Sequence, residues 1–295
     1  MSAVSRLLLR CLGTGLSGLM ALGACLPVRA EPAMHWLLSD LPPGVRIVDG
    51  RPTDGMADRV LLYLARLHPE QPQIYDLVNV RRAEIMLRQG VEACHGAMMW
   101  SPQRGEEFLF VETHRLPPPV LVVRRDHAAQ VPRDAAGLVD LGALAQRSGL
   151  RGGAVTGRSY GAYLDDWLAH EGQALPRHAL PDQAGRLLRM AARDRLDYLF
   201  EFDFILRFEQ GEDAELQQLV SLPLPGPEAL MPAGIMCPRT PWGERVAQRL
   251  RLELAQPAAV AERQAGLKRW LTPETEAFYR VQLDGYFRRA RQALR

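Results

Sequence analysis

Two proline-rich segments divide the chain and limit the folds open to it. Residues 116–119 read LPPP, and residues 223–227 read PLPGP. Consecutive prolines fix the backbone φ angle and remove amide donors, so such segments stiffen a connection and cannot lie inside a helix or a central strand. We therefore expect the chain to leave an outer body, to form a middle block, and to return through a second crossing.

The first part of the chain alternates apolar runs with helical patterns. We expect strands at 34–38, 74–80 and 91–97. Between them, Asp54 opens one helix whose apolar face repeats every three to four residues, and a second helix covers 81–89 and ends at Gly90. This order predicts a parallel sheet with helical crossovers.

The middle block repeats the same alternation, and the last part of the chain is helical. The expected strands are 120–123, 151–156, 175–180, 195–201 and 216–222, with short helices between them. A strand at 231–237 follows the second crossing, and helices at 258–270 and 273–293 close the chain. Phe278 and Leu283 belong to an apolar stripe on the last helix, which we expect to be core.

Residues 1–30 have the features of an export signal. Arg6 and Arg10 form a positive start, residues 11–26 are apolar and glycine-rich, and residues 28–30 resemble a cleavage site. We expect a periplasmic protein beginning at residue 31. The alternative is a lipoprotein, because Cys25 ends a sequence that resembles a lipidation motif.

Composition and cysteine content exclude some classes of protein. The 295 residues carry a formal net charge of +2, which favours neither nucleic acid nor an anionic membrane as partner. An exported chain would retain Cys94 and Cys237, either as one disulfide or as two buried thiols. Neither cysteine has metal-ligand spacing with a histidine, so we expect no metal and no cofactor.

Arg104 is the first candidate ligand-binding residue. Ser101 and Pro102 form a helix-start signal just past the strand at 91–97, so Arg104 lies in the first turn beyond the carboxyl end of that strand. An Arg in this place can hold a carboxylate with two parallel hydrogen bonds. The alternative is a surface Arg on a loop.

Two further segments of the middle block carry polar groups at strand ends. Residues 157–161 read GRSYG and connect a strand to a helix, so Arg158, Ser159 and Tyr160 lie near free amide groups. The alternative is a capped helix with no ligand. Glu201 ends the strand at 195–201, with Asp203 close behind, and either could hold a ligand ammonium group or form a structural ion pair.

The segments SPQRGEEFLF, GRSYG and RLDYLFE resemble the ligand-binding segments of bacterial periplasmic solute-binding proteins of the polar-amino-acid type. The resemblance covers nearly the whole mature chain. It implies an α/β fold of two lobes (the type II periplasmic-binding-protein fold), with residues 31–117 and 228–295 in lobe 1 and residues 118–227 in lobe 2. It also implies that the returning strand lies beside the strand at 91–97, which would pair Cys237 with Cys94.

The same resemblance assigns roles to residues in the cleft between the lobes. It implies that Arg104 holds the ligand carboxylate, that Arg158 and Ser159 complete this site, and that Glu201 holds the ligand amine. A residue of the first strand or of the loop after it would cover the ligand, either Trp36 or Leu41. The family carries small hydroxyl residues where this chain has Ala97, Met98 and Met99. Met98, Met99 and Trp100 indicate an apolar pocket wall, and the alternative is that they belong to the core.

We therefore expect a monomeric binding protein for a small anionic or amino-acid-like ligand. Its partner would be a membrane permease or a membrane sensor. An enzyme of the cyclohexadienyl dehydratase type on the same fold is the alternative, with Glu201 as the acid.

Overall fold

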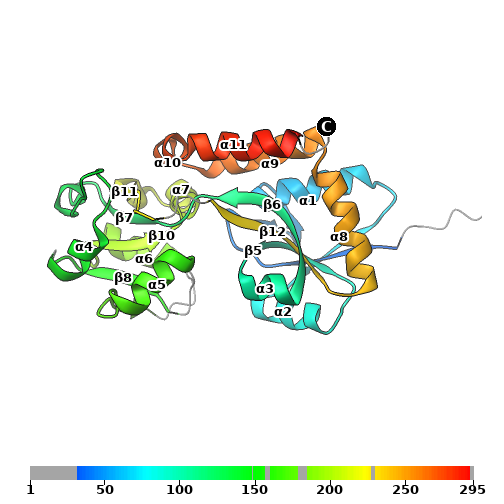
Figure 1. Ribbon diagram of the computed structural model, residues 1–295, viewed down its shortest axis with the longest axis horizontal. Helices are drawn as coiled ribbons and strands as arrows, with labels where there is room; N and C mark the ends of the chain where they lie inside the picture. The colour runs from blue at the N-terminus through cyan, green and yellow to red at the C-terminus, as the bar shows by residue number, and fades with distance from the viewer. Residues whose placement is uncertain (1–31, 148, 157–159, 179–184, 227–229, 293–295) are drawn as a thin grey trace, which may run out of the picture.

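The computed structural model describes residues 32–147, 149–156, 160–178, 185–226 and 230–292. Within these residues the chain forms two lobes, each built around a five-stranded sheet flanked by helices (Figure 1). The two-lobed α/β fold expected from the sequence is confirmed. No helix of the described residues combines the length and the apolar character that spanning a bilayer requires.

The sheet of lobe 1 has the strand order β4-β1-β5-β12-β6. Strands β4, β1 and β5 are parallel, whereas β12 is antiparallel to both of its neighbours. Their bounds are β1 Met34–Leu38, β4 Gln73–Leu77, β5 Cys94–Met99, β6 Phe108–Leu116 and β12 Met231–Pro238. The flanking helices are α1 (Met56–Leu67), α2 (Val80–Arg88), α3 (Pro102–Glu107) and α8 (Pro241–Leu254), and β2 (Ile47–Val48) pairs with β3 (Arg51–Pro52).

The sheet of lobe 2 has the order β11-β7-β10-β8-β9. Strand β10 is antiparallel to β7 and parallel to β8. The strands are β7 Val120–Arg124, β8 Gly152–Val155, β9 Arg177–His178, β10 Tyr198–Glu201 and β11 Leu219–Leu222. The helices are α4 (Leu141–Arg147), α5 (Ala162–His170), α6 (Gly185–Ala192) and α7 (Asp203–Glu212), with short 3-10 turns at Ala128–Gln130 and Ala214–Gln218.

Several element boundaries differ from those expected. The strand expected at 74–80 ends at Leu77, because the Asn79 side chain accepts a hydrogen bond from the Arg82 amide and begins α2. Helix α7 was not expected. The expected closing helix is divided at Tyr279 into α10 (Pro273–Phe278) and α11 (Arg280–Gln292).

The last three helices, α9 (Pro257–Trp270), α10 and α11, form a layer that extends from lobe 1 across the crossings to α7 at the near edge of lobe 2 (Figure 1). Their buried side chains pack with Leu116 and Leu230 beside the two crossings, and with Phe202 and Phe204 at the start of α7. The buried Asp203 carboxylate accepts hydrogen bonds from the amide of Thr272 (2.8 Å) and from its hydroxyl (3.0 Å). The helical layer therefore binds lobe 2 as well as lobe 1.

A disulfide joins the two central strands of lobe 1. Cys94 of β5 and Cys237 of β12 are bonded and fully buried, and 143 positions separate them in the sequence. The pairing implied by the family resemblance is confirmed. Because this loop contains all of lobe 2, the bond restricts the unfolded chain over nearly half of its length.

We expect Cys94→Ala/Cys237→Ala to lower the free energy of unfolding by about 2–5 kcal/mol, because the double variant loses this restriction on the unfolded state. Chemical denaturation with and without dithiothreitol measures the effect. The reductant should destabilise the wild type and leave the double variant unchanged. Equal stability of the two proteins under oxidising conditions would contradict the prediction.

His95, the second residue of β5, is a buried neutral group beside the carboxyl end of β1. The Ala97 amide donates to its Nδ1 (3.2 Å), so Nε2 carries the proton and faces the Ser39 hydroxyl at 3.2 Å. That hydroxyl donates in turn to the carbonyl of Val78 (2.8 Å). Burial, with a smaller contribution from the Arg104 charge, lowers the pKa of His95 to about 4.

We expect this pKa to make the protein less stable in acid. The unfolded chain gains a proton on His95 below about pH 6.5, whereas the folded chain gains it only near pH 4, so stability falls between these values. At pH 5 the loss attributable to His95 is about 2 kcal/mol. His95→Gln removes it, so unfolding curves at pH 7.5 and pH 5 should differ less in this variant. An unchanged pH dependence would contradict the prediction.

Candidate functional site

A cavity of about 920 Å³ lies between the lobes. Lobe 1 contributes residues 99–104 after β5 and the charged ends of α2 and α3, and lobe 2 contributes residues 160–165 at the start of α5. The crossings supply Pro118, Pro119 and residues 230–232. Phe278 and Tyr279 of the C-terminal layer complete the lining. Both lobes and both crossings therefore meet at a single cavity.

Arg104 lines this cavity, as expected from the sequence. The Ser101 hydroxyl accepts a hydrogen bond from the Arg104 amide, and Pro102 occupies the first position of α3, so the helix begins where the cap pattern predicted. The guanidinium is held from two sides, because Nε donates to Glu84 Oε1 (3.0 Å) and Nη1 donates to the carbonyl of Met99 (2.8 Å).

These two contacts change what Arg104 can offer a ligand. Among the described residues, Nη2 donates no hydrogen bond, and the side chain is 27% exposed. Nη2 can therefore donate to a carboxylate without displacing Glu84 or the Met99 carbonyl. A two-bond grip through Nε and Nη2 would require the contact of Nε with Glu84 to be given up.

The charges around Arg104 are balanced. Arg88 binds Glu107 (2.6 Å) and approaches Glu84 (3.7 Å), and all of these side chains line the cavity with Arg104. Two guanidinium groups face two carboxylates, so this network has no net formal charge. It orients the Arg104 side chain without a strong local field for a multiply charged ligand.

The GRSYG segment is described only in part. Arg158 and Ser159 lie outside the described residues. Tyr160 lines the cavity, but its side chain is only 1% exposed, and its hydroxyl accepts a hydrogen bond from the Val155 amide (2.9 Å). Its own amide donates to Asp165 Oδ1 (2.7 Å), which fixes the turn that leads into α5.

Three expected site residues do not line the cavity. Glu201 is buried at the end of β10, where Oε1 accepts a hydrogen bond from the Phe202 amide (2.7 Å). Trp36 lies in the core of lobe 1 and donates to Gln73 (2.8 Å). Leu41 is 53% exposed and lies beside a second, more open pocket near Ser39 and Arg81.

The structure places three exposed aromatic residues in the cavity wall, of which the sequence indicated only Trp100. Trp100, Tyr163 and Phe278 all line the cavity and are 40%, 41% and 43% exposed. Phe278 was expected in the core, and this expectation is wrong because α10 ends at the cavity. Met99 lines the cavity as the expected apolar wall. Of these three aromatic residues, only Trp100 has a position in the sequence, directly between β5 and α3, that indicates a place at the cavity.

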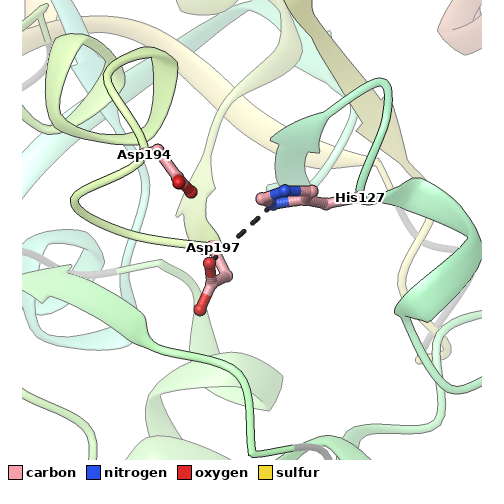
Figure 2. A group of neighbouring side chains, drawn as sticks. All are labelled: His127, Asp194 and Asp197. Carbon is pink, nitrogen blue, oxygen red and sulfur yellow. Dashed lines mark ion pairs between the residues drawn. The ribbon is translucent and has the colours of Figure 1, made fainter.

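A separate cluster in lobe 2 combines His127, Asp194 and Asp197, and Figure 2 shows the imidazole facing the Asp197 carboxylate. Their ligand atoms lie within 4.8 Å of one another. However, Arg151 already donates to Asp197 through its amide (2.6 Å), Nε (3.0 Å) and Nη2 (2.8 Å), and this contact lowers the pKa of that carboxyl group. We therefore interpret the cluster as an ion pair that fixes the starts of β8 and β10.

Comparisons of sequence find no relatives: no family model matches the chain, and no curated protein matches it. Comparisons of structure do. A probable amino-acid ABC transporter extracellular-binding protein, YtmK from Bacillus subtilis, is 15% identical over 83% of this chain and 100% of its own, with a TM-score of 0.62.

Two other solved structures are also similar to this chain. One, from work on glutathione import through GshT and the cystine importer TcyBC of Streptococcus mutans, is 13% identical over 81% of this chain and 95% of its own, with a TM-score of 0.62. The VFT2 domain of Bordetella pertussis BvgS is 19% identical over 81% and 94%, with a TM-score of 0.60. At these identities the likeness establishes the fold alone, which is the two-lobed α/β fold of these solved structures.

Proposed function

We propose that this protein is a periplasmic solute-binding protein that captures a small ligand with an acidic group between its two lobes. The observation that carries the proposal is the cavity of about 920 Å³, which is lined from both lobes and has Arg104 in its wall. Ligand pockets of this size, apolar with a few polar groups, are typical of binding sites between domains.

Arg104 is the proposed contact for the ligand's acidic group. Its Nη2 can donate to a carboxylate while Glu84 and the Met99 carbonyl hold the rest of the guanidinium. Arg158 and Ser159 remain the proposed contacts from lobe 2. An amino-acid-like ligand would need an acceptor for its amine, and Asp165 is the carboxylate of lobe 2 in the cavity wall.

Capture would work through closure of the lobes. We take residues 31–117 and 228–295 as lobe 1 and residues 118–227 as lobe 2, joined by two short crossings that act as a hinge. A ligand that contacts both lobes favours the closed state only through its greater affinity for that state. A permease or a sensor in the inner membrane would recognise the closed form, after residues 1–30 have directed export.

The enzyme alternative has less support. Its proposed acid, Glu201, accepts a hydrogen bond from its neighbour's amide and does not line the cavity. A general acid must be within hydrogen-bond reach of the group that it protonates. Binding without turnover is therefore the function that the cavity supports best.

The test is a thermal-shift screen against amino acids, aromatic acids and small dicarboxylates, followed by calorimetry on every hit. A ligand present at 100 times its Kd should add about 2.7 kcal/mol of stability. Arg104→Ala should weaken binding of such a ligand by about 10- to 100-fold, because a hydrogen bond between two charged groups is lost.

Arg193→Ala is the matched control, since Arg193 pairs with Glu215 on the surface of lobe 2 and does not line the cavity. It should bind as the wild type does. If Arg104→Ala binds every ligand as tightly as the control, Arg104 is not the contact for the acidic group. If the ligand is consumed during the measurement, the enzyme alternative replaces the proposal.

A further inference from the structure

The cavity exposes aromatic side chains from three separate parts of the chain. Trp100 follows β5 in lobe 1, Tyr163 is in the first turn of α5 in lobe 2, and Phe278 ends α10. Each keeps 40–43% of its surface exposed, although large aromatic side chains gain most from burial. Exposed rings that converge on one cavity indicate a surface that is completed by a ligand.

Two of these rings rest against glycines, one in each lobe. A Cβ atom at Gly105 would lie 3.0 Å from Nε1 of Trp100, and a Cβ atom at Gly226 would lie 2.9 Å from Cδ1 of Tyr163. Any larger residue at either position would push the ring away. The backbone of each glycine therefore packs against one side of the ring, and the other side of the ring is exposed to the cavity.

The charged groups that the described residues place in the cavity wall do not match a multiply anionic ligand. The network of Arg88, Arg104, Glu84 and Glu107 is already balanced, and Nη2 is the nitrogen of Arg104 that donates to no described residue. A second charged group on the ligand would lose its hydration on binding and would find no new partner in this network. Burying a charge in this way is unfavourable in free energy. The wall elsewhere consists mainly of Met, Pro, Leu and aromatic side chains.

We propose that the ligand of this cleft is an aromatic monocarboxylic acid. Its ring is held between Trp100 of lobe 1 and Tyr163 of lobe 2, and its carboxylate meets Nη2 of Arg104. The inference rests on the proposed function and names the ligand class for the same cavity. Because one ring comes from each lobe, a planar ligand gains its second ring contact only when the lobes close, so the stacking itself favours the closed state.

The test compares probes that differ in one property at a time. Indole-3-acetate and benzoate carry a ring and one charge, cyclohexanecarboxylate has the size and charge of benzoate without its π system, and L-glutamate and L-arginine are polar amino acids. Calorimetry on the full protein should give at least about fivefold tighter binding for benzoate than for cyclohexanecarboxylate, and tighter binding again for indole-3-acetate.

The variants assign the effect to the two rings. Trp100→Ala and Tyr163→Ala should each weaken binding of indole-3-acetate by about tenfold, and Trp100→Phe and Tyr163→Phe should retain most of the affinity. Leu252→Ala is the control, since Leu252 is 60% exposed on α8 and does not line the cavity. Thermal unfolding without ligand checks that each variant is folded.

The experiment distinguishes a wrong ligand class from a wrong proposed function. If a polar amino acid binds through Arg104 with equal affinity in the wild type, Trp100→Ala and Tyr163→Ala, the proposed function stands and the aromatic class is wrong. The class is also wrong if cyclohexanecarboxylate binds as tightly as benzoate. If no probe of either kind binds, both the aromatic class and ligand capture at this cavity are overturned.

Discussion

The insertion of β12 between β5 and β6 is the constraint on which the two-lobed arrangement depends. The returning strand pairs along the whole of β6, from Met231 opposite Leu116 to Pro238 opposite Phe108, and the disulfide from Cys237 to Cys94 fixes its other side. The chain therefore leaves lobe 1 and re-enters it at adjacent points. Because the Trp100 amide also donates to the Pro232 carbonyl (2.9 Å), the start of the cavity wall is attached to this same strand. The position of one strand thus sets both the crossing between the lobes and the edge of the cavity.

The C-terminal helices add a second connection between the lobes. Helix α9 packs on α1 of lobe 1, whereas Thr272 binds Asp203 at the start of α7, and Trp270 packs edge-on against Phe208 with ring centroids 5.6 Å apart. Arg46 of lobe 1 also lies over the Phe208 ring, 5.5 Å from its centroid. Breaking the buried Asp203 contacts would leave a carboxylate without partners, which is costly. The closure proposed above would therefore disturb these contacts least if it pivoted near Phe202, where residues beside the crossings and residues of the helical layer share one hydrophobic cluster.

The sequence predicted the local features of this molecule better than its long-range contacts. The crossings, the cap at Ser101 and the place of Arg104 follow from short patterns, since proline geometry and helix capping act over a few residues. The pairing of Arg104 with Glu84, 20 residues earlier, depends on how α2 and α3 pack, and no local pattern encodes it. Phe278 has the periodicity of a core residue, and only the end of α10 at the cavity exposes it. The pairing of Cys94 with Cys237 was predicted only from the family resemblance. The two cysteines lie 143 positions apart, and their spacing alone could not show that they pair.

The state of Arg104 decides which ligands the cleft can favour. A guanidinium without partners would attract any anion. The Arg104 guanidinium is already bonded to Glu84 and to the Met99 carbonyl, so it loses little further side-chain freedom on binding, and Nη2 is the nitrogen that donates to no described residue. Affinity beyond that single contact must then come from apolar surface, at roughly 25 cal/mol for each Å² removed from water. Trp100 and Tyr163 expose such surface, one from each lobe, so in the proposed complex the energy that selects the ligand and the energy that closes the lobes would come from the same contacts.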